Sequence, residues 1–229
     1  MTPTGTLSSL QTESKIAAFF DLDNTLLPGE ASEVRFFRAL WKRKVVGWQE
    51  LRASVWWLIR HTPPLSLQPL RERKLYLAAK PAQVIEPLGE EFCREELCPV
   101  VSADGMRKME IHRQSGHLVM LITGSLDFLV QPIASALCVD RCVAAVLEQK
   151  DGVYTGHLTS PLPYGAGKRH LIQRLATELD LDLESCFAYG DSPGDLEILE
   201  AVGHPTVVNP IRGMKSIAVR NGWPIERWR

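Results

Sequence analysis

Short apolar runs separated by helical patterns constrain the fold of this chain more than any other feature. Each run has three to five residues, which suits a strand buried on both faces of a parallel sheet. Alternation of such strands with helices is typical of an α/β fold with a Rossmann-like parallel core. An Asp-Gly pair at 151–152 further predicts a β-hairpin at the sheet edge over 148–158. We expect the parallel strands at 16–20, 118–122, 143–147, 186–189 and 206–208.

The stretch between the first two predicted strands is too long for a single crossover. It carries apolar residues at three- and four-residue spacing and shows no strand-like alternation. We expect helices over 33–48, 49–60, 69–79 and 84–97. The predicted organisation is a flexible lead-in over 1–14, an α/β core over 15–29 and 100–229, and an inserted helical cap over 30–99.

Composition excludes several classes of protein. The 229 residues include 26 Lys+Arg and 27 Asp+Glu, for a formal net charge of −1. A chain with so little net charge has no long-range electrostatic attraction to nucleic acid or to an anionic membrane, so we expect neither as a partner. The five cysteines form no C-x-x-C pair, and no apolar run is long enough to span a bilayer. These features favour a cytoplasmic protein and leave its oligomeric state open.

Two pairs of carboxylates follow predicted strands. Asp21 and Asp23 come directly after the first strand, and Asp191 and Asp195 follow the strand at 186–189. The carboxyl ends of parallel strands meet at one sheet edge, where ligands bind. Like charges about 4 Å apart repel by about 4 kcal/mol at an effective dielectric constant of about 20. Such a cluster therefore indicates a cation, and Mg2+ prefers oxygen ligands.

Both carboxylate pairs also fit interpretations without catalysis. The first is compatible with an acidic turn before a helix, and the second with a helix start capped by Asp191 or Ser192. A calcium-binding EF-hand is disfavoured, because Leu26 and Ser32 stand where that loop requires Gly and Glu.

Three further residues suit the binding of a phosphate. Thr123 and Gly124 follow the second predicted strand and offer a hydroxyl and a backbone N–H to an anion. Lys168 opens the helical pattern that follows the hairpin and would add a positive charge. A helix cap and a solvated lysine are the alternative interpretations. No Walker A loop is present, because Arg169 replaces its Ser/Thr.

The chain resembles the haloacid-dehalogenase-like (HAD) phosphohydrolases in four successive motifs: Asp21-Leu22-Asp23-Asn24-Thr25, Thr123-Gly124, Lys168 and Gly190-Asp191-Ser192-x-x-Asp195. The helical insertion after the first motif resembles subfamily IB, the phosphoserine-phosphatase-like branch. The resemblance implies a Rossmann-like core and Mg2+-dependent hydrolysis of phosphomonoesters through an aspartyl-phosphate. Gly194 departs from the pattern, because phosphoserine phosphatases usually have Asn before the last Asp.

The resemblance also implies a role for each motif residue. Asp21 would be the nucleophile and a metal ligand, Asp191 a second carboxylate ligand, and Asp23 a carbonyl ligand and the general acid/base. Asp195 would hold Lys168 or a metal-bound water. The group that cradles the phosphoryl would consist of Thr123, Gly124 and Lys168.

The expected substrate is a small, amine-bearing phosphomonoester of the histidinol phosphate or phosphoserine type. Glu30, nine residues after Asp21, matches a substrate-facing glutamate of the phosphoserine enzymes, although a first-turn helix glutamate is the alternative. Phosphotransfer to another acceptor and a non-hydrolytic signalling phosphoacceptor remain rival functions. The basic run at 42–44 beside Trp41 and Trp48 also allows a nucleic-acid surface, which the neutral charge disfavours.

Overall fold

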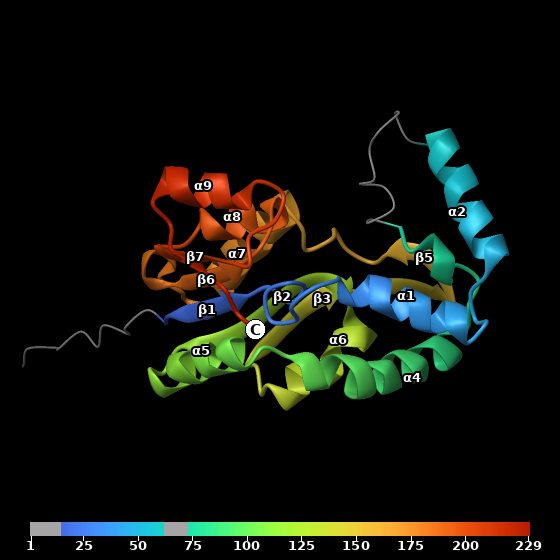
Figure 1. The fold of residues 1–229 in the computed structure, drawn as a ribbon, viewed down its shortest axis with the longest axis horizontal. Helices are drawn as coiled ribbons and strands as arrows, with labels where there is room; N and C mark the ends of the chain where they lie inside the picture. Colours follow the sequence, from blue (N-terminus) through green and yellow to red (C-terminus); the bar gives the residue numbers. More distant parts are fainter. Residues whose placement is uncertain (1–14, 62–72) are drawn as a thin grey trace, which may run out of the picture.

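The computed structural model describes residues 15–61 and 73–229. Its main sheet has six parallel strands in the order β3-β2-β1-β6-β7-β8 (Figure 1). The five predicted strands are all present, and the short strand at the C-terminal end was not predicted. Their bounds are β1 Ala17–Phe20, β2 Leu118–Leu126, β3 Arg141–Ala145, β6 Phe187–Gly190, β7 His204–Val208 and β8 Ile225–Glu226.

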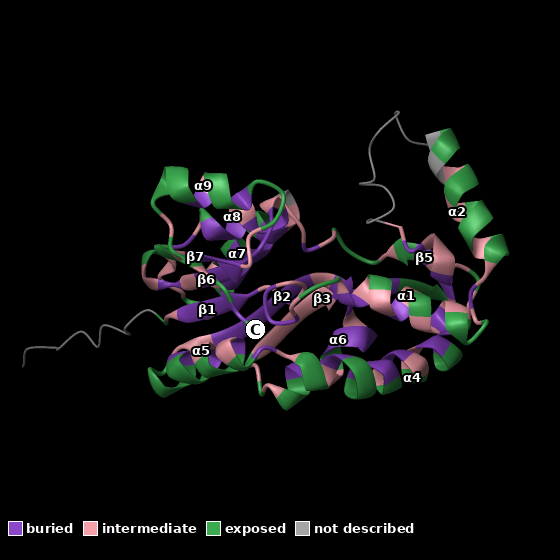
Figure 2. Ribbon diagram, in the orientation of Figure 1, coloured by how far each residue is buried: buried purple, intermediate pink, exposed green. Residues whose placement is uncertain are grey.

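Helices cover both faces of this sheet, and the strands between them are buried (Figure 2). Alternate residues of β1 point to opposite faces: Ala18 and Phe20 join one apolar cluster, while Ala17 and Phe19 join the other. An apolar strand of this kind is stable only between two layers. The helices are α5 Ala103–Gln114 and α6 Asp127–Ala136 on one side, and α7 Ala166–Leu179, α8 Leu196–Leu199 and α9 Met214–Asn221 on the other (Figure 1).

A helical segment lies between β1 and β2, as predicted. The first predicted helix ends early, at Lys42, and Lys44 then adopts a positive φ of 59°. The predicted helix at 69–79 falls partly outside the described residues, and its described part holds a single 3-10 turn. The elements are α1 Ser32–Lys42, α2 Trp48–His61, η1 Leu75–Leu77, α4 Ala82–Phe92, the π-helix η2 Cys93–Leu97 and η3 Cys98–Val100.

The predicted hairpin is present, but it does not lie at the edge of the main sheet. Strands β4 (Leu147–Lys150) and β5 (Val153–Leu158) form a separate two-stranded sheet. Its turn has positive φ angles at Asp151 and Gly152, the conformation for which Asp-Gly is favoured. The backbone of β5 hydrogen-bonds to residues 74–80 of the inserted segment at 2.8–3.0 Å. The hairpin therefore packs on the insertion.

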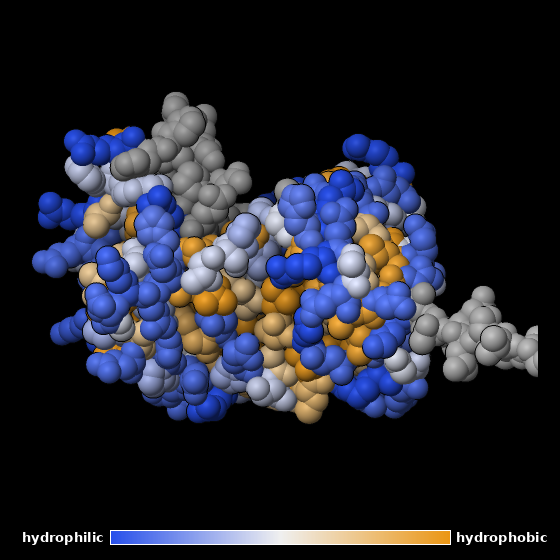
Figure 3. Space-filling model, turned by 180° about the vertical axis from the view of Figure 1, so that it is seen from behind, coloured by the Kyte–Doolittle hydropathy of each residue, from blue (hydrophilic) through white to orange (hydrophobic). Residues whose placement is uncertain are grey.

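No helix in the described ranges is long and apolar enough to cross a membrane. Seen from behind, hydrophilic side chains dominate the margins of the molecule and hydrophobic ones gather toward its middle (Figure 3).

Candidate active site

Asp21 pairs with a buried lysine at the carboxyl end of the sheet. The backbone N–H of Asp21 donates to the carbonyl of Tyr189 on the neighbouring strand at 2.9 Å. Lys168, in the first turn of α7, places its Nζ 2.6 Å from Asp21 Oδ1, and it is only 2% exposed. The interpretation of Lys168 as a solvated surface residue is therefore wrong.

Asp195 holds the other side of this lysine. Its Oδ1 lies 2.5 Å from Lys168 Nζ, while its Oδ2 accepts hydrogen bonds from the backbone N–H groups of Asp191 and Ser192 and from the Ser192 hydroxyl. Gly190 makes room for it, because a Cβ there would lie 2.5 Å from the Cβ of Asp195. Asp195 thus fixes both the lysine and the loop that carries Asp191.

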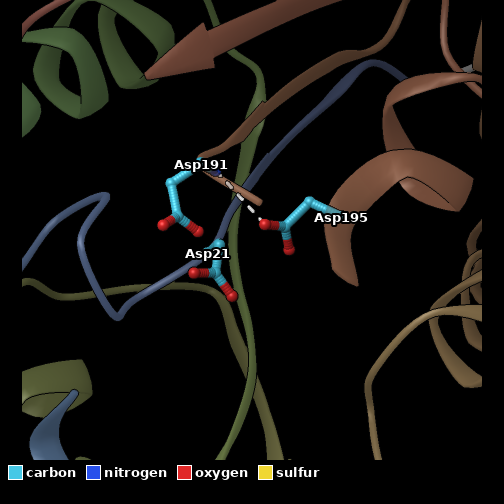
Figure 4. A group of neighbouring side chains, drawn as sticks. All are labelled: Asp21, Asp191 and Asp195. Atoms are coloured by element: carbon cyan, nitrogen blue, oxygen red, sulfur yellow. Dashed lines mark hydrogen bonds between the residues drawn. The ribbon is translucent and has the colours of Figure 1, made fainter. Parts of the chain in front are cut away.

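Asp191 completes a cluster of three carboxylates with Asp21 and Asp195 (Figure 4). One oxygen from each lies within 4.8 Å of the other two. Burial, and then the charge of Asp195, raises the pKa of Asp21 well above its ordinary value and that of Asp191 to about 7. Burial lowers the pKa of Lys168, but the two carboxylates outweigh it and raise that pKa.

This cluster suits a divalent cation. Lys168 pairs with Asp21 and Asp195, and Asp191 lies beside them, so negative charge is in excess. Together with burial, which is the larger cause, the charge of Asp195 raises the pKa of Asp21 and of Asp191. Oxygen donors at this spacing are the kind that Mg2+ takes. The side chain of Asp23 does not belong to the group.

The carboxylate of Asp23 is held by two serines from different parts of the chain. Its Oδ1 accepts from the backbone N–H of Ser32 at the start of α1, and its Oδ2 from the hydroxyl of Ser125 on β2, both at 2.7 Å. The two serine hydroxyls lie 2.8 Å apart. The first inserted helix therefore contacts the residue expected to act as acid and base.

Replacing Ser125 by alanine is expected to lower kcat about tenfold with little change in KM. A hydrogen bond to a charged group is worth about 1.5–3 kcal/mol, and without it the Asp23 carboxyl is less firmly oriented. Steady-state kinetics would measure this, with Ser125→Thr retaining the hydroxyl and the exposed Ser216→Ala as a matched control. An unchanged kcat in Ser125→Ala would show that Asp23 needs no support from β2.

Thr123 and Gly124 lie on β2, the strand that pairs with β1. This strand continues to Leu126, beyond the end predicted at residue 122. Thr123 is buried, and its Oγ1 accepts from the N–H of Ser125 at 3.1 Å. A Cβ at Gly124 would meet Leu162 at 3.7 Å, an ordinary contact. Steric packing against Leu162 therefore does not require a glycine at position 124. The absence of a side chain there is compatible with a ligand that approaches the backbone.

Glu30 and Gly194 are placed differently from the other motif residues. Glu30 is exposed, and both its carboxylate oxygens contact the guanidinium of Arg38. Gly194 is buried beside Tyr164, whose ring would lie 2.2 Å from a Cβ at that position. An Asn at this position, as in the phosphoserine enzymes, would therefore require the Tyr164 ring to move.

Two asparagines that the sequence analysis did not select support the site. Asn24 Nδ2 donates to Asp191 Oδ2 at 2.9 Å and to the carbonyl of Asn209, while Asn209 Nδ2 donates to the carbonyl of Asn24. Asn209 directly follows β7, so the strand-end rule that identified Asp191 would also have identified it.

Comparison with known proteins identifies the family. Residues 18–200 match the model of the haloacid dehalogenase-like hydrolases. Phosphoserine phosphatase SerB1 of Mycobacterium tuberculosis is 32% identical over 220 residues, which cover 93% of this chain and 71% of that protein. Histidinol-phosphatase of Neisseria meningitidis is 28% identical, covering 92% of this chain and 98% of that one.

Solved structures agree on the fold. A Bordetella pertussis protein of unknown function superimposes with a TM-score of 0.79 at 27% identity, covering 93% of this chain and 98% of the other. A phospho-aspartyl intermediate analogue of phosphoserine phosphatase gives a TM-score of 0.66 at 19% identity, covering 94% of both chains. The chain belongs to the haloacid dehalogenase-like hydrolase family. Within that family it is a phosphatase-type hydrolase.

Proposed function

We propose that this protein hydrolyses small phosphomonoesters by way of a phosphoryl group carried on Asp21. The observation that carries the proposal is the buried Lys168, fixed between Asp21 and Asp195 beside the third carboxylate of the cluster. A lysine at this place would offset the repulsion between a carboxylate nucleophile and a phosphate dianion.

The proposed reaction has two displacements. An oxygen of Asp21 attacks phosphorus, the bond from phosphorus to the ester oxygen breaks, and the protonated Asp23 gives its proton to the departing alcohol. Asp23 then takes a proton from water, whose oxygen attacks the phosphorus and releases phosphate from Asp21. The hydroxyl of Thr123 and the N–H of Gly124 would hold the phosphoryl oxygens. The hydrogen bonds from Ser32 and Ser125 support an oriented Asp23.

Mg2+ is the proposed cofactor. The carboxylates of Asp21 and Asp191 and the backbone carbonyl of Asp23 would bind it, and Asn24 holds Asp191 in place for this role. When bound, the ion would neutralise phosphate charge and act as a Lewis acid. The excess of carboxylate charge over Lys168 supports this proposal.

Chelation by EDTA is expected to stop phosphate release, and added Mg2+ to restore it. Ca2+ should substitute poorly, because its longer and looser coordination misaligns Asp21.

Because the ion binds the folded state, Mg2+ at 100 times its Kd should also stabilise the protein by about 2.7 kcal/mol. Thermal unfolding would measure this shift, which should disappear in Asp191→Asn. Full turnover by a rigorously metal-free preparation would contradict the assignment.

We propose an amine-bearing phosphorylated metabolite as the substrate. Support comes from the relatives named phosphoserine phosphatase and histidinol-phosphatase, both of which are named for substrates that carry an amine. Glu30 would meet that amine. Its exposed pairing with Arg38 is of a kind worth about 0–1 kcal/mol, so a substrate cation can replace the guanidinium at little cost.

Replacing Glu30 by glutamine is expected to raise KM for an amine-bearing phosphate about tenfold, as a lost contact of about 1.4 kcal/mol predicts. With p-nitrophenyl phosphate the change should matter little. Arg38→Gln is the matched control, because it breaks the same ion pair and keeps the carboxylate. Equal losses in both variants, or on both substrates, would make Glu30 a structural residue.

Three further proposals complete this function. Residues 30–99 act as a cap over the core, and the contact from Ser32, at the start of α1, to Asp23 supports this division.

Water is the acceptor of the phosphoryl group. A screen of phosphorylated metabolites, scored for both phosphate and phosphorylated alcohols, would separate hydrolysis from transfer. The protein works in the cytoplasm, which its five free cysteines support.

A further inference from the structure

Helix α2 presents an apolar face to solvent. We call this face the α2 stripe; Trp48 is 70% exposed and Ile59 74% exposed, and the other members are also exposed. Apart from the adjacent Val55 and Trp56, successive members are three or four residues apart, which places them along one side of the helix. Most of α2 is coloured as exposed in Figure 2. The stripe consists of Trp48, Leu51, Val55, Trp56 and Ile59.

The side of α2 that contacts the described rest of the insertion carries polar residues together with Trp57, over whose ring the guanidinium of Arg73 lies at 4.8 Å from the centroid. Glu50 pairs with Lys80 at 2.6 Å and accepts from the N–H of Gly47 at 2.8 Å. Ser54 donates to the carbonyl of Glu50. A surface helix normally turns its apolar side toward the protein. In α2 the stripe stays largely exposed, and the contact of the Trp48 ring with that of Trp41, at a centroid distance of 5.3 Å, accounts for only part of its apolar surface.

Basic residues lie within α2 and in the segment just before it. Residues 42–61 contain five Lys or Arg and one Glu, in a chain whose net charge is −1. Glu50 is neutralised by Lys80, and Arg43 is paired with Glu91. In ranges 15–61 and 73–229, Lys42, Lys44 and Arg52 have no ion pair. The guanidinium of Arg60 lies 4.1 Å above the ring of Trp56. The positive charge around the stripe is therefore in excess.

We propose that the α2 stripe and the basic residues Lys42, Lys44, Arg52 and Arg60 dock this protein onto the surface of an anionic lipid bilayer. An amphipathic helix with aromatic and aliphatic side chains on one side and basic residues beside them lies in the plane of such a surface. The apolar side chains enter the boundary of the acyl chains, and the basic ones contact the headgroups. The net charge of the whole chain did not predict a membrane partner. The local excess of positive charge over residues 42–61 does.

Charge and side-chain type favour a bilayer over other partners. Nucleic acid would use the basic residues and the tryptophans, but it offers no apolar phase for Leu51, Val55 and Ile59. A second copy of the chain would bring two sets of basic residues together, which is repulsive. In Figure 1, α2 lies at the far end of the molecule from the main sheet. No residue of α2 belongs to the carboxylate cluster or holds Asp23, so docking through it would leave the proposed chemistry in place.

Sedimentation of the full-length protein with lipid vesicles tests the proposal. Binding is expected to equimolar phosphatidylcholine–phosphatidylglycerol vesicles and to be weak with phosphatidylcholine alone. Ile59→Ser should lower the affinity about tenfold, and Arg52→Gln about fivefold. The matched controls are Val219→Ser and Lys215→Gln on α9, both exposed, which should bind as the unchanged protein does. Hydrolysis of p-nitrophenyl phosphate should be equal in all four variants.

Several results would overturn the proposal. One is equal affinity of Ile59→Ser and Val219→Ser for the anionic vesicles. Another is binding to a single-stranded oligonucleotide without binding to vesicles, which would assign the surface to nucleic acid. A third is a dimer that Ile59→Ser dissociates, with no vesicle binding by either protein. Because the readout is binding, an inactive protein that still binds vesicles would refute the proposed function and leave the docking surface intact.

Discussion

Replacing Asp21 by asparagine is expected to reduce phosphate release by at least about 1,000-fold while the protein stays folded. Asparagine keeps the volume of the side chain but has no carboxylate to carry the phosphoryl group. Because burial and Asp195 raise the pKa of Asp21, its charged form is disfavoured in the metal-free protein. Thermal unfolding without metal should therefore be unchanged or should occur at a higher temperature.

Mass spectrometry must accompany this measurement, because deamidation restores aspartate. Asp182→Asn is a suitable control, since Asp182 caps a 3-10 turn away from the carboxylate cluster. That variant should keep its activity. Activity of Asp21→Asn above a few per cent of the unchanged protein, with deamidation excluded, would falsify the role of Asp21 as nucleophile.

Replacing Lys168 by methionine is expected to lower both activity and stability. The change leaves Asp21 and Asp195 without their common cation, and breaking a buried ion pair from one side costs about 3 kcal/mol or more in the free energy of unfolding. We also expect kcat/KM to fall by at least about 1,000-fold, because no positive side chain then faces the phosphoryl group. Denaturant unfolding and steady-state kinetics would measure the two effects.

The double variant Lys168→Met, Asp195→Asn separates the two effects. Removing one carboxylate together with the lysine restores the charge balance, so much of the lost stability should return while activity stays low. Lys215→Met, at an exposed position, controls for the methionine. If the double variant were as unstable as Lys168→Met, charge balance would not be the reason for the loss.

The sequence predicted the elements that follow simple periodicities. Strands such as 17–20 are short, apolar and buried on both faces, so their composition alone identifies them. Asp21 and Asp191 follow such strands, and strand order in a parallel sheet brings strand ends together whatever the length between them. This is why residues 170 positions apart were expected at one site.

The rest depended on contacts between distant segments that no local pattern records. Ser32 and Ser125 meet at Asp23 only because α1 begins beside the end of β2. The turn of the hairpin was predictable from Asp151-Gly152, but its pairing with residues 74–80 was not, since β5 forms backbone hydrogen bonds that any sequence can make. The packing of Tyr164 against Gly194 is likewise visible only in three dimensions.

The most direct test of the account is a search for phosphate on Asp21. The protein would be mixed with Mg2+ and a phosphomonoester, quenched in acid within one turnover, and digested for mass spectrometry. We expect a phosphate on the peptide that contains Asp21, at higher occupancy in Asp23→Asn, in which the water is no longer activated, provided that the ester has a good leaving group. No such phosphate in either protein, while the unchanged enzyme turns over the same ester, would contradict the account.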